Sequence, residues 1–246
     1  MEYGQMKLMI GAVIEAGGFP QAEPLDSIER IMEPPNHHPT GLEISAYSMA
    51  LASFSEWNRA EAVAHRITDN EDERGHALAS LSQKLADAGF TERAENIARS
   101  IPIDSNLTDV LVEQAFAFTK IASRLVKSGQ NDRAERLLRD AESLVTLRKR
   151  ADHIKASLLD DIAHIWKEMN QRDEYLRLWD EAIAVAKESI KIYRAGGAPD
   201  VDSWKSLASI ATGLAEAGEH ERVELALQAI DNEAWRQRAA DKIHES

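Results

Sequence analysis

Apolar residues recur along the chain in a register that repeats six times. Each copy has an anchor position, and the residues nine, thirteen and sixteen positions before it are apolar or aromatic in every copy. Because spacings of three and four residues fall on one side of a helix, each copy is predicted to contain a helix with one apolar face. The anchors are Ala22, Ala60, Ala94, Ala134, Tyr175 and Val223.

A turn residue stands five positions before each anchor, and a second apolar stripe follows each anchor. Gly is the residue that best accepts the left-handed conformation with which many helices end, and Asn is the next best. The position twelve before the anchor is mostly small, as at Ser48 and Ser82, which lets two helix backbones approach closely. Each copy is therefore predicted to be a helical hairpin. The turn residues are Gly17, Ser55, Gly89, Gly129, Asn170 and Gly218.

The anchors are 38, 34, 40, 41 and 48 residues apart, a period typical of helical-hairpin repeats. We expect one all-α domain over residues 1–246, because stacked repeats share one continuous core. A last helix carrying Trp235 and Ala239 on one face and polar residues on the other is expected to cap the stack. The predicted hairpins are about 1–33, 41–68, 71–102, 107–147, 151–196 and 200–230, with the capping helix at 232–244.

The pattern of side-chain sizes before the anchor resembles the tetratricopeptide repeat. Large residues stand sixteen, thirteen and nine positions before the anchor, and in most copies a small residue stands twelve positions before it. The turn Gly and the Ala five residues later belong to the same pattern, which runs from about Met6 to Ile230. The chain departs from it in its looser spacing, in a closing Pro found only at Pro34, and in Asn170 and Tyr175 of the fifth copy. The resemblance implies a right-handed α-α superhelix of about six hairpins with a C-terminal capping helix.

The same resemblance implies a concave groove, lined by the first helix of each hairpin, that receives a peptide or a helix. Phe116 and Met49 would offer apolar contacts there. The family's carboxylate clamp is not supported, because Gly11 and Ala46 stand where it needs Asn. The predicted groove residues are Met49, His76, Gln83, Asp87, Phe116, Thr119, Ser123, Lys127, Asp160, His164, Lys167, Lys205, Thr212 and Glu216.

The second helix of the fifth hairpin is predicted to be the longest. Its apolar stripe runs from Asp173 to about Arg194 and stops at Gly196. The extension carries Lys187, Lys191 and Arg194, a small basic tip on an acidic protein. The residues leave two interpretations open: the extension packs against the sixth repeat, or it is a secondary contact for a partner or a second subunit.

The composition of the chain limits the kinds of partner, bound metal and cellular location that we expect. The chain has 42 Asp and Glu against 29 Lys and Arg, a net charge of −13, which weighs against nucleic-acid binding. The absence of Cys excludes disulfides and Cys-ligated zinc and fits a cytoplasmic location. No apolar run approaches the roughly 20 residues that span a membrane. The basic run at 148–150 allows two interpretations, a small anion or nucleic-acid patch and a salt-linked helix junction, and the adjacent Asp152 favours the junction.

No catalytic or nucleotide-binding signature occurs in the sequence, so we expect neither an enzyme nor a cofactor. An acid three residues before a His recurs three times, but eight His among 42 acids in 246 residues would give roughly 1.4 such pairs by chance. His153, Asp160 and His164 share one helix face over 151–169, and a metal-dependent enzyme using them is the minor alternative.

These observations favour a non-enzymatic protein–protein interaction module, an adaptor, scaffold or chaperone-like protein that holds another protein or a peptide. A structural protein that self-assembles, such as a homodimer formed through the end helix or the long fifth hairpin, is the second hypothesis. The sequence names no partner.

Overall fold

A computed structural model describes residues 40–68, 70–102 and 108–245. These residues form eleven α-helices, and no strand occurs among them. The first predicted hairpin, 1–33, lies outside the described residues. The chain separates into two compact units, residues 1–124 and 125–246, each described by itself below. The prediction of a single domain over the whole chain therefore stays a prediction.

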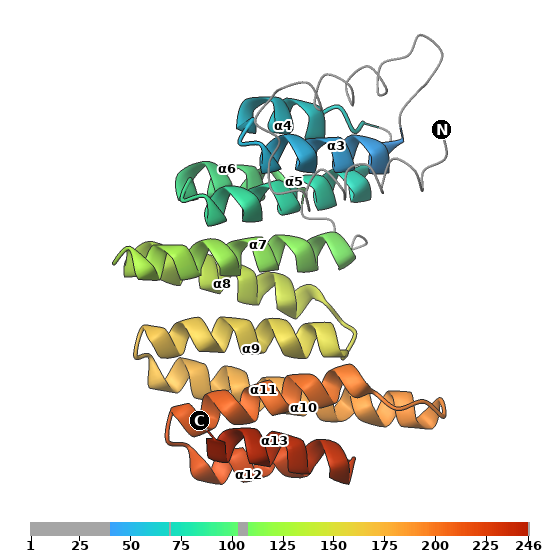
Figure 1. The fold of residues 1–246 in the computed structure, drawn as a ribbon, viewed down its shortest axis with the longest axis vertical. Helices are drawn as coiled ribbons and strands as arrows, with labels where there is room; N and C mark the ends of the chain where they lie inside the picture. Colours follow the sequence, from blue (N-terminus) through green and yellow to red (C-terminus); the bar gives the residue numbers. More distant parts are fainter. Residues whose placement is uncertain (1–39, 69, 103–107, 246) are drawn as a thin grey trace. The chain divides into compact units, whose positions relative to one another are not determined.

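The described helices of the first unit are α3 to α6 and most of α7 (Figure 1). Within this unit α3 packs on α4, α5 packs on α6, and α5 also contacts the preceding pair. Their bounds are α3 Gly41–Ser53, α4 Trp57–Ala64, α5 Glu71–Asp87, α6 Thr91–Ser100 and α7 Thr108–Lys127.

The second unit contains the end of α7 and all helices from α8 to α13. Here α9 packs on α10 and α11 packs on α12, while α13 contacts both α11 and α12. Sequence-adjacent helices thus pair in both units. The bounds are α8 Asn131–Leu147, α9 His153–Glu168, α10 Arg172–Ala195, α11 Val201–Glu216, α12 His220–Ala229 and α13 Glu233–Glu245.

The apolar register forms the core. All fifteen of its large apolar positions from the second copy onward are buried, and the most exposed of them, Ile44, is only 7% exposed. The small position also has a defined contact, because the hydroxyl of Ser48 donates to the carbonyl of Ala60 at 2.7 Å and that of Ser82 to the carbonyl of Ala94 at 2.8 Å. In these two copies a buried hydrogen bond joins the small position to the anchor.

The predicted turn residues adopt the left-handed conformation. Ser55, Gly89, Gly129, Asn170 and Gly218 have φ between 57° and 88°. In each turn the next residue donates its N–H back to the carbonyl nine positions before the anchor, for example Phe90 to Leu85 at 2.9 Å. This is the hydrogen-bonding pattern of the Schellman motif, which satisfies the free carbonyls at a helix end.

Candidate functional site

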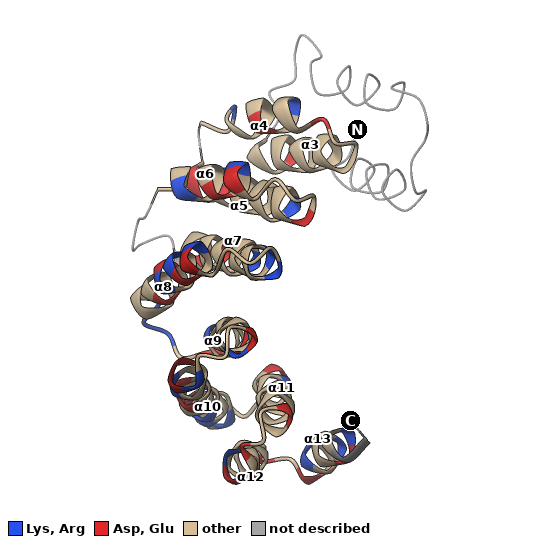
Figure 2. Ribbon diagram, turned by 90° about the vertical axis from the view of Figure 1, so that its left-hand side faces the viewer, with Lys and Arg blue, Asp and Glu red and all other residues tan. Residues whose placement is uncertain are grey.

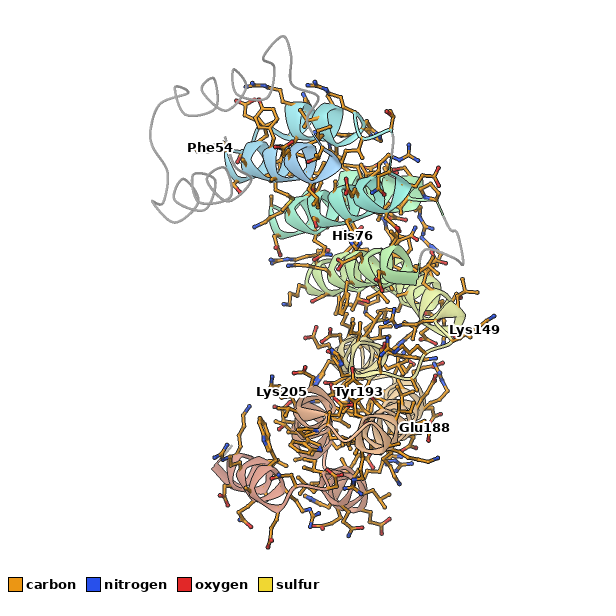
Figure 3. The ribbon with its side chains drawn as sticks, turned by 90° about the vertical axis from the view of Figure 1, so that its right-hand side faces the viewer. Phe54, His76, Lys149, Glu188, Tyr193 and Lys205 are labelled. Atoms are coloured by element: carbon orange, nitrogen blue, oxygen red, sulfur yellow. The ribbon has the colours of Figure 1, made fainter. Side chains whose placement is uncertain are left out.

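The predicted groove residues lie on the first helix of each pair, on α3, α5, α7, α9 and α11. Most are half-buried or exposed, as a binding surface requires, and Figure 3 shows His76 on α5. Two of the predicted residues are too buried to contact a partner. Thr119 is 6% exposed and donates to the carbonyl of Ala115, and Asp160 is 4% exposed. We therefore leave Thr119 and Asp160 out of any direct contact with a partner.

In the first unit, the charge of Asp87 is satisfied within the protein. Its carboxylate lies 2.8 Å from Lys120 and 3.0 Å from Arg124. Burial by itself would raise the pKa of Asp87, but these two cations lower it overall. Gln83 and Phe116 are both half-buried, so each has surface left to contact a ligand.

In the second unit, three predicted residues line one open hollow of about 340 Å³. His164 comes from α9 and Lys205 and Thr212 come from α11, where Figure 3 shows Lys205. The remaining wall comes from Ala208 and Ser209 of α11 and from four residues of α13, namely Trp235, Arg238, Ala239 and Lys242. We call these nine residues the cationic hollow.

Sequence reasoning missed the contribution of α13 to the hollow. That helix was expected only to cap the stack, yet it supplies two of the cations and the indole of Trp235. Figure 2 shows the Lys and Arg positions of α13 in blue. The signal was present as Arg238 and Lys242, four residues apart and so on one face of the helix. What the sequence could not show is that this face turns toward α11.

Asp160 fixes the orientation of His164. Its carboxylate lies 3.4 Å from Nε2 of His164 and accepts a hydrogen bond of 2.8 Å from the indole N–H of the buried Trp179. The imidazole also packs edge-on against that indole, with 5.4 Å between ring centres. The hydrogen bond to Asp160 raises the pKa of His164 above its usual 6.5, against the opposing effect of burial. The shift favours the protonated, positively charged form of the imidazole.

The start of α13 is tied to the helices beside it. Asn232 caps it by accepting from the N–H of Trp235 at 3.1 Å, and Arg236 donates twice to the carbonyl of Ile230, at 2.7 and 3.0 Å. The ring of Trp235 lies 6.3 Å from that of Trp204 of α11, measured between ring centres. The wall that α13 contributes is therefore held in place before any ligand arrives.

The basic tip of the fifth hairpin is largely engaged within the protein. Arg194 forms an ion pair with Asp231, in the loop between α12 and α13, and Lys191 lies 3.4 Å from Glu188 of its own helix. Only Lys187 of the three has no ion-pair partner within the described part of the chain. These contacts favour packing as the role of the extension, and a secondary contact with a partner stays a prediction.

The other chemical candidates do not assemble into a site. No group of three or more His, Asp or Glu side chains that could hold a metal ion occurs among the described residues, which include His153, Asp160 and His164. The basic run is a helix junction: Arg148 is buried and donates to Asp152 at 2.6 Å, while Lys149 is exposed (Figure 3). In residues 40–68, 70–102 and 108–245, no helix is both long and apolar enough to cross a membrane.

Comparisons with known proteins add little to this picture. No protein-family model matches the chain, and no curated protein matches it. Among solved structures, the crystal structure of Ton1535 from Thermococcus onnurineus NA1 aligns with 98% of this chain and 90% of that chain, at 15% sequence identity and a TM-score of 0.33. A TM-score of this size does not establish a shared fold.

Proposed function

We propose that the chain is a tetratricopeptide-like repeat protein, a right-handed superhelix of helical hairpins that binds a segment of another protein along its first helices. The observation that carries the proposal is the repeated turn: five consecutive turns share one left-handed residue and one backbone hydrogen-bonding pattern at the same register positions. Repetition of one hairpin geometry is what generates a stacked array, and such arrays work through extended binding surfaces.

The surface chemistry supports a peptide or helix as the ligand. The first helices present half-buried polar and apolar side chains together, including Gln83 and Phe116 in the first unit and Lys167 and Thr212 in the second. Such a mixture can hydrogen-bond a peptide backbone and also bury part of an apolar side chain. No candidate catalytic group among the described residues offers an equally specific alternative.

The test is affinity capture from an extract of the source cells with the wild-type protein and a Gln83→Ala/Phe116→Ala variant. Captured proteins should be lost or strongly depleted with the variant, because it removes one hydrogen-bonding and one apolar contact on the same wall. A Lys84→Ala/Glu92→Ala variant, altered at two exposed positions of α5 and α6, is the matched control and should retain them. Equal capture by all three proteins would remove these two residues from the binding surface.

Self-assembly remains the competing hypothesis. Light scattering over a wide concentration range distinguishes it from the binding proposal: a mass that rises with concentration supports a homodimer or larger assembly. A monomer at every concentration leaves the binding of a different protein as the function to test.

A further inference from the structure

We propose that the cationic hollow binds an acidic segment of a partner protein, with one or two Asp or Glu side chains of that segment placed between α11 and α13. This inference rests on the proposed function and names the chemistry of the partner. It also extends the binding surface from the first helices to α13, which the sequence assigned only a capping role.

The charge of the hollow is opposite to that of the protein. The whole chain carries −13, yet none of the nine residues that line the hollow is acidic, while His164, Lys205, Arg238 and Lys242 can all carry positive charge. Three carboxylates near the hollow are already engaged within the protein. Asp202 pairs with Lys205 at 2.8 Å, Glu216 pairs with Lys167 at 2.6 Å, and Asp160 is hydrogen-bonded to His164 and Trp179.

Arg238 is the cation best placed to receive a ligand. It is exposed at the rim of the hollow and has no ion pair or hydrogen bond within the described part of the chain. A guanidinium can bind a carboxylate with two parallel hydrogen bonds, a stronger interaction than one between neutral groups. Lys242 stands one helical turn further along the same face, so both can reach acidic side chains of one segment.

The shape of the hollow favours a chain segment over a small enclosed ligand. Its rim consists of the exposed residues Lys205, Ser209, Arg238 and Lys242, so it is open to solvent. The volume of about 340 Å³ is at the small end for a ligand pocket and suits a few side chains. Ala208, Ala239 and the half-buried indole of Trp235 give an apolar wall, so the segment should carry an apolar residue beside its acids.

The experiment begins with selection of random twelve-residue peptides, displayed on phage, on the full-length protein at low salt. Recovered sequences should be enriched in Asp and Glu next to an apolar residue. The best of them is then made synthetically with a fluorescein label, and its affinity is measured by fluorescence anisotropy. Raising NaCl from about 50 mM to about 300 mM should weaken binding, because exposed charges are screened over shorter distances.

Two pairs of substitutions with equal charge changes locate the site. Arg238→Ala/Lys242→Ala should bind the labelled peptide at least about tenfold more weakly, because it removes two charge-assisted contacts. The control is Arg136→Ala/Lys149→Ala, which removes one exposed Arg and one exposed Lys of the same unit. It should change the affinity by less than about twofold, because salt screens exposed charges beyond about 10 Å. Arg238→Gln/Lys242→Gln keeps the aliphatic stems and guards against a folding effect; it should weaken binding as the alanine variant does.

The outcomes separate this inference from the proposed function. Peptides that are not acidic, or acidic peptides that bind both double variants equally, overturn the inference and leave the proposed function standing. Full competition by free glutamate or inorganic phosphate at the peptide's own concentration shows a small-anion site and also overturns it. Recovery of no peptide from any selection counts against the proposed function itself.

Discussion

The buried ion pair between Arg148 and Asp152 should hold the α8–α9 junction together, so Arg148→Met is expected to destabilise the protein strongly. The two side chains are 7% and 4% exposed, and the guanidinium donates to both carboxylate oxygens, at 2.6 and 3.3 Å. The same carboxylate caps α9 by accepting from the N–H of Lys155 at 3.0 Å. Methionine keeps the length of the side chain but leaves the carboxylate buried without its cation.

The size of the expected loss in free energy of unfolding depends on which groups still surround Asp152 in Arg148→Met. Removing one partner of a buried ion pair typically lowers the free energy of unfolding by about 3–5 kcal/mol, because the other charge stays buried. Asp152 would keep the N–H of Lys155 and the guanidinium of Arg150, which lies 3.7 Å away but is 69% exposed. These two groups place the expected loss near the lower end, about 3 kcal/mol.

The assay is urea unfolding followed by tryptophan fluorescence at pH 7. Four of the five tryptophans, at 166, 179, 204 and 235, belong to the second unit, so the signal reports mainly on the unit that contains the substitution. Lys191→Met is the control, because its pair with Glu188 is exposed and should contribute less than about 0.5 kcal/mol. A loss below about 1 kcal/mol for Arg148→Met would refute the reasoning from burial.

Acid should reduce this difference in stability. Burial by itself raises the pKa of Asp152, but the hydrogen bonds from Arg148 and Lys155 and the charge of Arg148 lower it overall. A carboxyl whose pKa is lowered on folding stabilises the protein above its unfolded pKa of about 3.9, and this contribution disappears as the pH falls through the folded pKa. The gap between wild type and Arg148→Met should therefore be widest near neutral pH and narrow below about pH 4. Arg148→Met/Asp152→Ser removes both charges, keeps a capping hydroxyl and should recover much of the loss.

Three further predictions test other contacts. In Gly213→Ala the new Cβ would lie 2.6 Å from the ring of Trp179 and 2.7 Å from that of His164. The variant should be less stable than wild type, because overpacking costs about 1–3 kcal/mol and the gain in helix propensity is only roughly 1 kcal/mol. A variant as stable as wild type in urea unfolding would contradict this. Ser82→Ala removes the buried hydrogen bond to the carbonyl of Ala94 and should lower the free energy of unfolding in urea by about 1 kcal/mol. Ser209→Ala, at an exposed position, should lower it by less than about 0.5 kcal/mol. Asp160→Asn should lower the pKa of His164, measured by NMR titration of the imidazole carbons, whereas Asp180→Asn, whose carboxylate pairs with Arg222, should not.

The turns could be predicted from sequence because their determinants are local. A residue that tolerates positive φ, at a fixed distance from an apolar stripe, is enough to specify a helix end. Asn170 shows the strength of this rule: it replaces Gly in the fifth copy and still adopts φ 57°. The burial of the large positions follows in the same way, since a helix with one apolar face must cover that face.

Apart from the junction at 148–152, the ion pairs between helices could not be predicted, because they join positions far apart in sequence. The residues beside two anchors are an example. Arg93, next to the anchor Ala94, donates to Glu61, next to the anchor Ala60 of the previous copy, at 2.6 and 3.0 Å. Arg139 of α8 likewise donates to Glu174 of α10, and this hydrogen bond is the largest cause that lowers the pKa of Glu174 to about 2. Each of these pairings depends on how two helices are placed against one another.

An acidic protein can still present a surface suited to an acidic ligand. Net charge is a sum over the chain, whereas a ligand responds to the charges that remain unpaired within about 10 Å of it, the screening distance in 0.1 M salt. Near the hollow, Asp202 and Glu216 are paired with lysines, while Arg238 is not neutralised by any described residue. The positions that weigh against the carboxylate clamp, Gly11 and Ala46, lie far along the chain from α13. They therefore do not bear on a site that α13 helps to build.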